Sequence, residues 1–170
     1  LASYGGSVFD EAIDKLATLT EDGFELDLSY FSFYLHRRRR FTSKLEALLG
    51  PERRPEEPLT QRHMDIAAGL QRLTEKLLLH LARLARRLTG ESRLCCAGGV
   101  MLNCVANARI QFEAGFDKVY FMPAASDAGT SLGAALYVAH VLGSDQPTIR
   151  AQNDYLGPGY DEAEIEAVLT

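Results

Sequence analysis

The chain of 170 residues is long enough for one domain with a sizeable core, and its composition, 46% hydrophobic and 24% charged, excludes a disordered protein. The net charge of −5 argues against a nucleic-acid-binding surface, and we interpret the local basic run Arg37–Arg40 as a solvated loop. No membrane-spanning apolar run or secretory leader is visible, so we expect no membrane partner and a cytoplasmic location.

The N-terminal part of the chain predicts a helix followed by a strand. A set of apolar residues recurs at helical spacing, namely Phe9, Ile13, Leu16 and Leu19. Gly23 ends this pattern, and residues 24–31 then alternate apolar and polar side chains with the period of a half-buried strand. A short helix is predicted over residues 42–49, and the proline-punctuated segment 50–58 indicates an exposed linker.

A long amphipathic helix is predicted over residues 59–88, with Thr60 as its cap and Gly90 just past its end. Its apolar stripe consists of Ile66, Leu70, Leu73, Leu77, Leu81 and Leu84. His63 and His80 lie too far apart on this helix to form a local metal pair, so we interpret them as core or surface residues rather than ligands.

Strands and helices alternate in the following part of the chain. An apolar run ending at Cys96 leads through two glycines into a helix, and residues 118–123 form a second apolar strand that leads into another helix from Asp127. The cysteines show neither disulfide nor zinc spacing, and we expect all three to be buried: Cys95, Cys96 and Cys104. This order predicts an α/β fold with a largely parallel sheet buried on both faces, and with ligand-binding loops at the carboxyl ends of its strands.

Two loops fall at such strand ends. Gly98 and Gly99 would let a phosphate approach the backbone without a Cβ in the way, although a tight turn explains them equally well. Asn103 and Asn107 share a helix face and could bond a ribose, a base or a neighbouring loop. Asp127 is either the N-cap of the helix that follows or a ligand of a divalent cation, and with the glycine turn it is typical of a nucleotide–metal site.

A resemblance to a known family is carried by segments in this order along the chain: GFELDLSYF, PLTQRHMDIAAGLQ, LCCAGGVMLNCVANARI, FMPAASDAGTSLGAAL and YLGPGYDEAEI. They are similar to segments of the carbamoyltransferase family, which includes the O-carbamoyltransferases of nodulation and antibiotic biosynthesis. The resemblance spans nearly the whole chain. It implies an actin-like lobe of the actin/Hsp70/sugar-kinase (RNase H-like) class, related to the tRNA threonylcarbamoyl-transfer protein.

The resemblance implies a reaction in which carbamoyl phosphate and ATP give a carbamoyl-adenylate, whose carbamoyl group passes to a hydroxyl of a small-molecule acceptor. It also implies a divalent metal, iron-like, beside the nucleotide. The residues that it places at the nucleotide are Gly98, Gly99, Val100, Asn103 and Gly129, and Asp127 matches the metal-ligand acid. Such a transfer needs a good leaving group and a cationic centre for oxyanion charge, which adenylation and a metal supply.

Parts of the family's pattern lie outside these residues. A His-x-x-x-His pair that supplies further metal ligands is missing, as is a second domain of a different fold. We therefore expect residues 1–170 to be the C-terminal lobe of an actin-like domain, with a truncated tail from about residue 145, that does not turn over by itself. The missing upstream lobe and the second domain would be its partners in the parent chain.

Other functions are compatible with the same residues. The chain could be the ATP-binding lobe of another actin-like phosphotransferase, which would not need carbamoyl phosphate. It could also be a non-catalytic packing lobe that forms a homodimer through the helix at 59–88. A tRNA-modifying role is a third possibility, although the acidic charge argues against direct RNA binding.

Overall fold

The computed structural model describes residues 1–34, 40–143 and 157–169, so most of the basic run at 37–40 lies outside the described residues. The chain divides into two compact units. Unit 1 consists of Leu1–Cys95 and Asn103–Tyr120, and unit 2 consists of Cys96–Leu102 and Phe121–Thr170. Each unit is described by itself.

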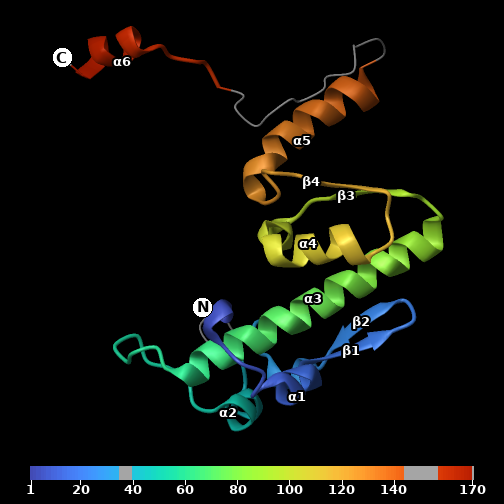
Figure 1. The fold of residues 1–170 in the computed structure, drawn as a ribbon, viewed down its shortest axis with the longest axis vertical. Helices are drawn as coiled ribbons and strands as arrows, with labels where there is room; N and C mark the ends of the chain where they lie inside the picture. Colours follow the sequence, from blue (N-terminus) through green and yellow to red (C-terminus); the bar gives the residue numbers. More distant parts are fainter. Residues whose placement is uncertain (35–39, 144–156, 170) are drawn as a thin grey trace. The chain divides into compact units, whose positions relative to one another are not determined.

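Unit 1 is organised around the long helix α3 (Gln61–Thr89), which confirms the helix predicted over residues 59–88 (Figure 1). The helix begins after Thr60, whose backbone N–H donates to Nδ1 of His63 at 2.9 Å. It ends at Gly90, whose φ of +69° is the left-handed conformation that glycine adopts at little cost. Both ends therefore lie where the capping residues predicted them.

The predicted N-terminal helix is shorter than its apolar spacing indicated. Helix α1 (Asp10–Ile13) continues as a 3-10 turn to Leu16, and the chain then forms strand β1 (Ala17–Thr20) instead of a further helical turn. Strand β1 pairs antiparallel with β2 (Gly23–Leu26), with Leu19 opposite Phe24. The predicted strand 24–31 is confirmed only at its start, because a 3-10 turn follows at Leu28–Tyr30.

The main core of unit 1 lies between α3 and the N-terminal elements. Its buried residues are Ile13, Leu16, Ala17, Tyr30, Leu49 and Leu73, and Ile66 and Leu77 of α3 pack against them. Helix α2 (Ser43–Leu49), predicted over residues 42–49, closes this core and ends at Gly50. The predicted apolar stripe on α3 is wrong at Leu70, which is 42% exposed. Leu79 and Ala82, outside the predicted stripe, are buried, because another helix, α4, covers a second side of α3.

Strand β3 (Arg93–Cys96), helix α4 (Cys104–Glu113) and strand β4 (Lys118–Phe121) follow α3 in the predicted order. Strand β3 pairs with β4. Asp117 N donates to Ser92 O, and Met122 N donates to Cys96 O, so the bonds advance in the same direction on both strands and the pair is parallel.

The expectation that this sheet is buried on both faces is wrong. In both strands exposed and half-buried residues alternate, so one face of the pair is exposed. The alternation leaves Cys95 exposed and Cys96 half-buried, and Cys104 is also exposed at the start of α4. The prediction of three buried cysteines is therefore wrong for Cys95 and Cys104.

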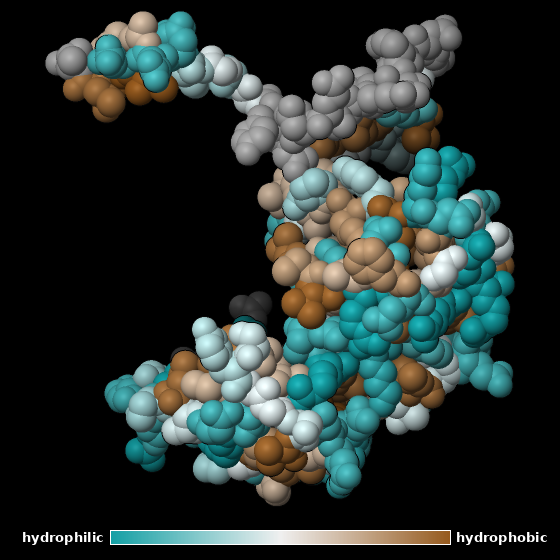
Figure 2. Space-filling model, in the orientation of Figure 1, coloured by the Kyte–Doolittle hydropathy of each residue, from teal (hydrophilic) through white to brown (hydrophobic). Residues whose placement is uncertain are grey.

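Hydrophilic and apolar surfaces are unevenly distributed over unit 1. Figure 2 shows hydrophilic side chains over the outer surface of α3 and apolar side chains over α4, where Val105 is 54% and Phe112 84% exposed. No helix within the described ranges combines the length and the apolar character that a membrane crossing requires.

Unit 2 contains the loops that follow β3 and β4, and helices α5 (Thr130–Tyr137) and α6 (Glu162–Leu169). The C-terminal end of α5 continues as a π-helical turn at Val138–Leu142. Helix α6 begins after Asp161, which exchanges side-chain-to-backbone hydrogen bonds of 2.8 and 2.9 Å with Glu164 in a capping box.

Candidate functional site

The first candidate loop is the glycine turn that follows β3. Gly98 has a φ of +103°, a conformation that residues with a Cβ rarely adopt, and a Cβ built on it would meet no atom within 4 Å. Met101 N donates to Gly98 O at 2.9 Å and closes the turn, and a 3-10 turn runs from Gly99 to Leu102. Val100 lies in that turn with 53% of its surface exposed. The space beside Gly98 that a Cβ would occupy is therefore open.

The second candidate loop connects β4 to α5. Its backbone is compact at Gly129, where an added Cβ would lie 2.1 Å from the carbonyl oxygen of Ala124. Gly129 N also donates to Ser126 O at 3.0 Å. A 3-10 turn over Asp127–Gly129 leads directly into α5. Gly129 thus makes a close backbone contact possible, and this contact sets the path of the chain through Asp127.

The two loops lie against each other within unit 2. Gly98 N donates to the carbonyl oxygen of Ala125 at 2.7 Å, and Met122 N donates to Cys96 O at 2.9 Å. A Cβ on Gly99 would lie 3.4 Å from Oγ of Ser126, so the first loop approaches the second closely at this glycine. The glycine turn and Asp127, which follows Ser126 directly, are therefore brought together.

The side chain of Asp127 does not cap the helix that follows it. Neither the 3-10 turn at Asp127–Gly129 nor α5 has a side-chain cap hydrogen bond. Thr130 Oγ1 donates at 2.6 Å to the backbone carbonyl of Asp127, not to its carboxylate. Asp127 is exposed, so the N-cap alternative is wrong and the carboxylate is left available to a ligand.

Metal-donor side chains are not gathered into a cluster in the part of the chain that the structure describes. Among residues 1–34, 40–143 and 157–169 there is no group of three His, Cys, Asp or Glu residues that could hold an ion. Asp127 would therefore be one ligand of a site whose other ligands come from elsewhere. The two histidines of α3 bond to backbone atoms, His63 as described above and His80 through Nε2 to Thr20 O at 2.9 Å.

Asn103, the remaining predicted nucleotide residue, belongs to unit 1 as the N-cap of α4. Its Oδ1 accepts a hydrogen bond from Ala106 N at 3.1 Å. Its amide also pairs with the amide of Gln71 on α3 through bonds of 2.8 and 3.0 Å. Gln71 lies in a half-buried part of α3, and no sequence signal marks it as a partner of Asn103.

The contact between α3 and α4 continues as a polar network beyond Gln71. Gln71 donates to Glu75 at 2.9 Å, and Arg109 of α4 lies 3.3 Å from the other carboxylate oxygen of Glu75. Arg109 also forms a two-point ion pair with Glu113, with distances of 2.7 and 2.8 Å. Hydrogen bonds from Arg109 lower the pKa of the Glu113 carboxyl, and the same bonds raise the pKa of the Arg109 guanidinium.

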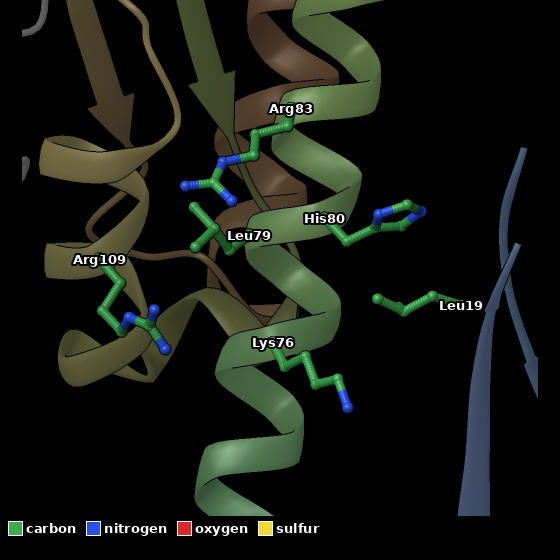
Figure 3. A pocket seen from close by; sticks show the side chains of 6 residues that line it. All are labelled: Leu19, Lys76, Leu79, His80, Arg83 and Arg109. Atoms are coloured by element: carbon green, nitrogen blue, oxygen red, sulfur yellow. The ribbon is translucent and has the colours of Figure 1, made fainter. Parts of the chain in front are cut away.

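Unit 1 also has a groove of about 400 Å³ (Figure 3). Its lining residues are Leu19, Lys76, Leu79, His80, Arg83 and Arg109. Figure 3 shows Arg83 and Leu79 projecting from α3 toward α4, whereas His80 and Lys76 project toward β1.

The polar groups of this groove are occupied by protein partners. Lys76 Nζ pairs with Asp14 at 2.9 Å, and Arg83 donates to the Glu113 carbonyl at 3.1 and 3.3 Å. Since the cations diverge and each already has a partner, the groove does not gather them around one anion. The loops of unit 2 are therefore the better candidate for a functional site.

Comparison with known proteins matches residues 1–136 to the family described as the carbamoyltransferase N-terminus. An uncharacterized protein of Synechocystis, sll1178, is 43% identical over 176 residues, which cover 99% of this chain and 28% of the relative. The nodulation protein NolO of Bradyrhizobium diazoefficiens is 44% identical over 62% of this chain and 19% of its own length. NolNO of Sinorhizobium fredii is 42% identical over 65% of this chain and 17% of its own length. The chain thus spans less than a third of the relatives it matches.

Proposed function

Because this chain belongs to the carbamoyltransferase family, we propose that it contributes the nucleotide-binding loops of an O-carbamoyltransferase. The enzyme uses carbamoyl phosphate and ATP, via a carbamoyl-adenylate, to carbamoylate a hydroxyl of a small-molecule acceptor. We place these loops in a lobe of actin-like fold. Since the matched relatives are more than three times as long, the rest of the parent protein completes the site, and this chain alone does not turn over. A cytoplasmic location, where ATP is available, is part of the proposal.

The observation that carries the proposal is the contact between the two loops. The bond of 2.7 Å from Gly98 N to Ala125 O holds the open glycine turn beside the loop that bears the uncapped Asp127 carboxylate. A glycine turn lets phosphates approach backbone N–H groups, and a carboxylate next to it can hold a cation that bridges those phosphates. We assign the nucleotide contacts to Gly98, Gly99, Val100, Asn103 and Gly129.

Asp127 is the residue that we assign to a divalent metal, with iron as the proposed ion. Its exposed carboxylate fits one position of an oxygen- and nitrogen-ligated site, and the remaining ligands come from the parent protein or from the substrates. When bound, such a cation acts as a Lewis acid that stabilises oxyanion charge in acyl transfer. The role of Asp127 is to hold the cation at the start of α5, next to the glycine turn.

Calorimetric titration of the full-length protein with ATP, with and without ferrous iron under anaerobic conditions, tests this proposal. We expect Asp127→Asn to weaken ATP binding about tenfold or more when iron is present and to leave it unchanged without iron. The melting temperature of the metal-free protein should not change, because no cap hydrogen bond is lost. Glu162→Gln, on the exposed first turn of α6, is the control for removing one acidic group from unit 2.

Two results would contradict the proposal. Absence of ATP binding by the wild-type protein in both conditions would remove its basis. An equal loss of affinity with and without iron, accompanied by a lower melting temperature, would indicate that Asp127 has only a structural role.

A further inference from the structure

Gln71 of α3 and Asn103 of α4 face each other through their side-chain amides. Asn103 Nδ2 donates to Gln71 Oε1 at 2.8 Å, and Gln71 Nε2 donates to Asn103 Oδ1 at 3.0 Å. Both residues belong to unit 1, and both are half-buried. A reciprocal pair of this kind restrains both side chains, because rotating either amide by half a turn would place donor against donor.

The hydrogen-bonding capacity of Asn103 is almost used up by protein groups. Its Oδ1 accepts from Gln71 and also from Ala106 N at 3.1 Å, which occupies both lone pairs of the oxygen. One hydrogen of Nδ2 goes to Gln71. The second N–H of the Asn103 amide makes no hydrogen bond within the part of the chain that the structure describes.

The orientation of Gln71 is itself fixed by Glu75, one helical turn further along α3. Glu75 Oε1 accepts from Gln71 Nε2 at 2.9 Å, and a carboxylate offers only acceptors. Glu75 is 9% exposed and its second oxygen lies 3.3 Å from Arg109, which holds the carboxylate in place. If the Gln71 amide turned over, its oxygen would face this carboxylate.

We propose that Gln71 is a positioning residue that fixes Asn103 so that it offers the nucleotide a hydrogen-bond donor and not an acceptor. The proposal rests on the proposed function, in which Asn103 contacts ATP. It assigns a role in ATP binding to Gln71 of α3. Gln71 lies 32 positions before Asn103 in the chain. The ligand group that faces Asn103 is then an acceptor, such as a hydroxyl, phosphate or ring-nitrogen lone pair.

Removal of the Gln71 amide in the full-length protein tests this role. We expect Gln71→Met, which keeps the length of the side chain, to raise the ATP dissociation constant about five- to tenfold, as the loss of one well-placed hydrogen bond does. Gln61→Met is the matched control. Gln61 lies on the same helix, and its side-chain amide donates two hydrogen bonds as that of Gln71 does, to Tyr4 O at 3.0 Å and Asp65 at 2.9 Å, but neither partner is on α4.

A double-mutant cycle separates positioning from a general loss of stability. Asn103→Ser keeps a side-chain oxygen that can cap α4 but removes the amide that pairs with Gln71. If Gln71 acts through Asn103, Gln71→Met has no further effect on ATP binding in the Asn103→Ser background. Gln61→Met should lower the melting temperature without changing the dissociation constant by more than about twofold.

The outcomes distinguish this inference from the proposed function. Wild-type binding of ATP with no change in Gln71→Met, or with an equal change in the Asn103→Ser background, overturns the positioning role and leaves the proposed function standing. Absence of ATP binding by the wild-type protein overturns both.

Discussion

At the scale of single residues, position 129 requires glycine because there is no space for a side chain, and not because of its backbone conformation. An added Cβ would lie 2.1 Å from the Ala124 carbonyl oxygen, and this backbone atom cannot move without shifting the loop that bears Asp127. We expect Gly129→Ala to destabilise the full-length protein by about 2 kcal/mol and to weaken ATP binding. Differential scanning calorimetry and ATP titration measure the two effects.

Gly133 provides the matched control for this substitution. It lies within α5, in the same unit, and a Cβ on it would meet nothing within 4 Å. Gly133→Ala should be neutral, or stabilising by about 0.5–1 kcal/mol, because alanine favours the helix. Equal losses of stability in both variants would contradict the steric explanation.

Asp65 makes the stability of unit 1 depend on pH. It is 7% exposed, and its Oδ1 accepts from Gly6 N at 2.7 Å and from Gln61 at 2.9 Å. These hydrogen bonds lower the pKa of its carboxyl. Because the folded pKa lies below the unfolded value of about 3.9, this stabilisation is complete above that value and is lost as the pH falls through the folded pKa.

We therefore expect Asp65→Asn to be less stable than the wild-type protein at pH 7, and the difference to shrink as the pH falls from about 5 to 2. Urea unfolding of both proteins across this range measures the difference. Asp22→Asn, at the exposed turn between β1 and β2, controls for the loss of a charge. A difference that stays constant with pH would exclude the Asp65 carboxylate as its cause.

The candidate site was predictable where it depends on local sequence. The strand-to-helix turns that place Gly98 and Asp127 follow from apolar runs ended by small residues, and the parallel pairing of β3 with β4 then brings the two turns together. The partner of Asn103 was not predictable in this way. Gln71 reaches Asn103 only through the packing of α3 on α4, and an isolated glutamine on a helix carries no signal of such a contact.

At the scale of elements, α3 was predictable because length, amphipathic spacing and both capping residues agree. The β1–β2 hairpin was missed because the helical spacing of Ile13 and Leu16 continues by chance to Leu19. The signal against a helix was Gly23, which follows the two-residue turn Glu21–Asp22 and begins β2, between two segments that alternate in polarity. Local turn chemistry outweighed the longer apolar pattern there.

The first segment of unit 1 is held on α3 by a close contact at Gly5. A Cβ on Gly5 would lie 2.0 Å from Met64 O of α3, whereas a Cβ on the neighbouring Gly6 would meet its nearest atom, Asp65 Oδ1, at 3.7 Å. We expect Gly5→Ala to detach this segment and to raise amide hydrogen exchange in residues 1–6 about tenfold or more. Gly6→Ala should leave exchange unchanged. Similar exchange in both variants would contradict the close contact.

At the scale of the whole molecule, the residues with assigned chemistry are divided between the two units. Gly98, Gly99, Val100, Asp127 and Gly129 belong to unit 2, and Asn103 with its partner Gln71 belongs to unit 1. The chain passes from unit 2 to unit 1 between Leu102 and Asn103. Within unit 2 the hydrogen bonds to Ala125 and Cys96 fix the beginning of the glycine loop, and within unit 1 the polar network of α3 and α4 fixes the side chain of Asn103.

The proposed reaction predicts which nucleotide product the full-length protein releases. Carbamoyl phosphate first reacts with water and gives carbamate and inorganic phosphate. The carbamate oxygen then bonds to the α-phosphorus of ATP and expels pyrophosphate, and transfer of the carbamoyl group from the resulting carbamoyl-adenylate to the acceptor hydroxyl releases AMP. We expect AMP and pyrophosphate to form only when carbamoyl phosphate is present, which phosphorus NMR of the reaction mixture detects. A phosphotransferase of related fold would instead release ADP with the acceptor alone. If ADP formed without carbamoyl phosphate, the proposed reaction would be wrong and the phosphotransferase alternative would take its place. The same loops would bind ATP in both reactions, but the attacking group would bond to a different phosphorus atom of ATP.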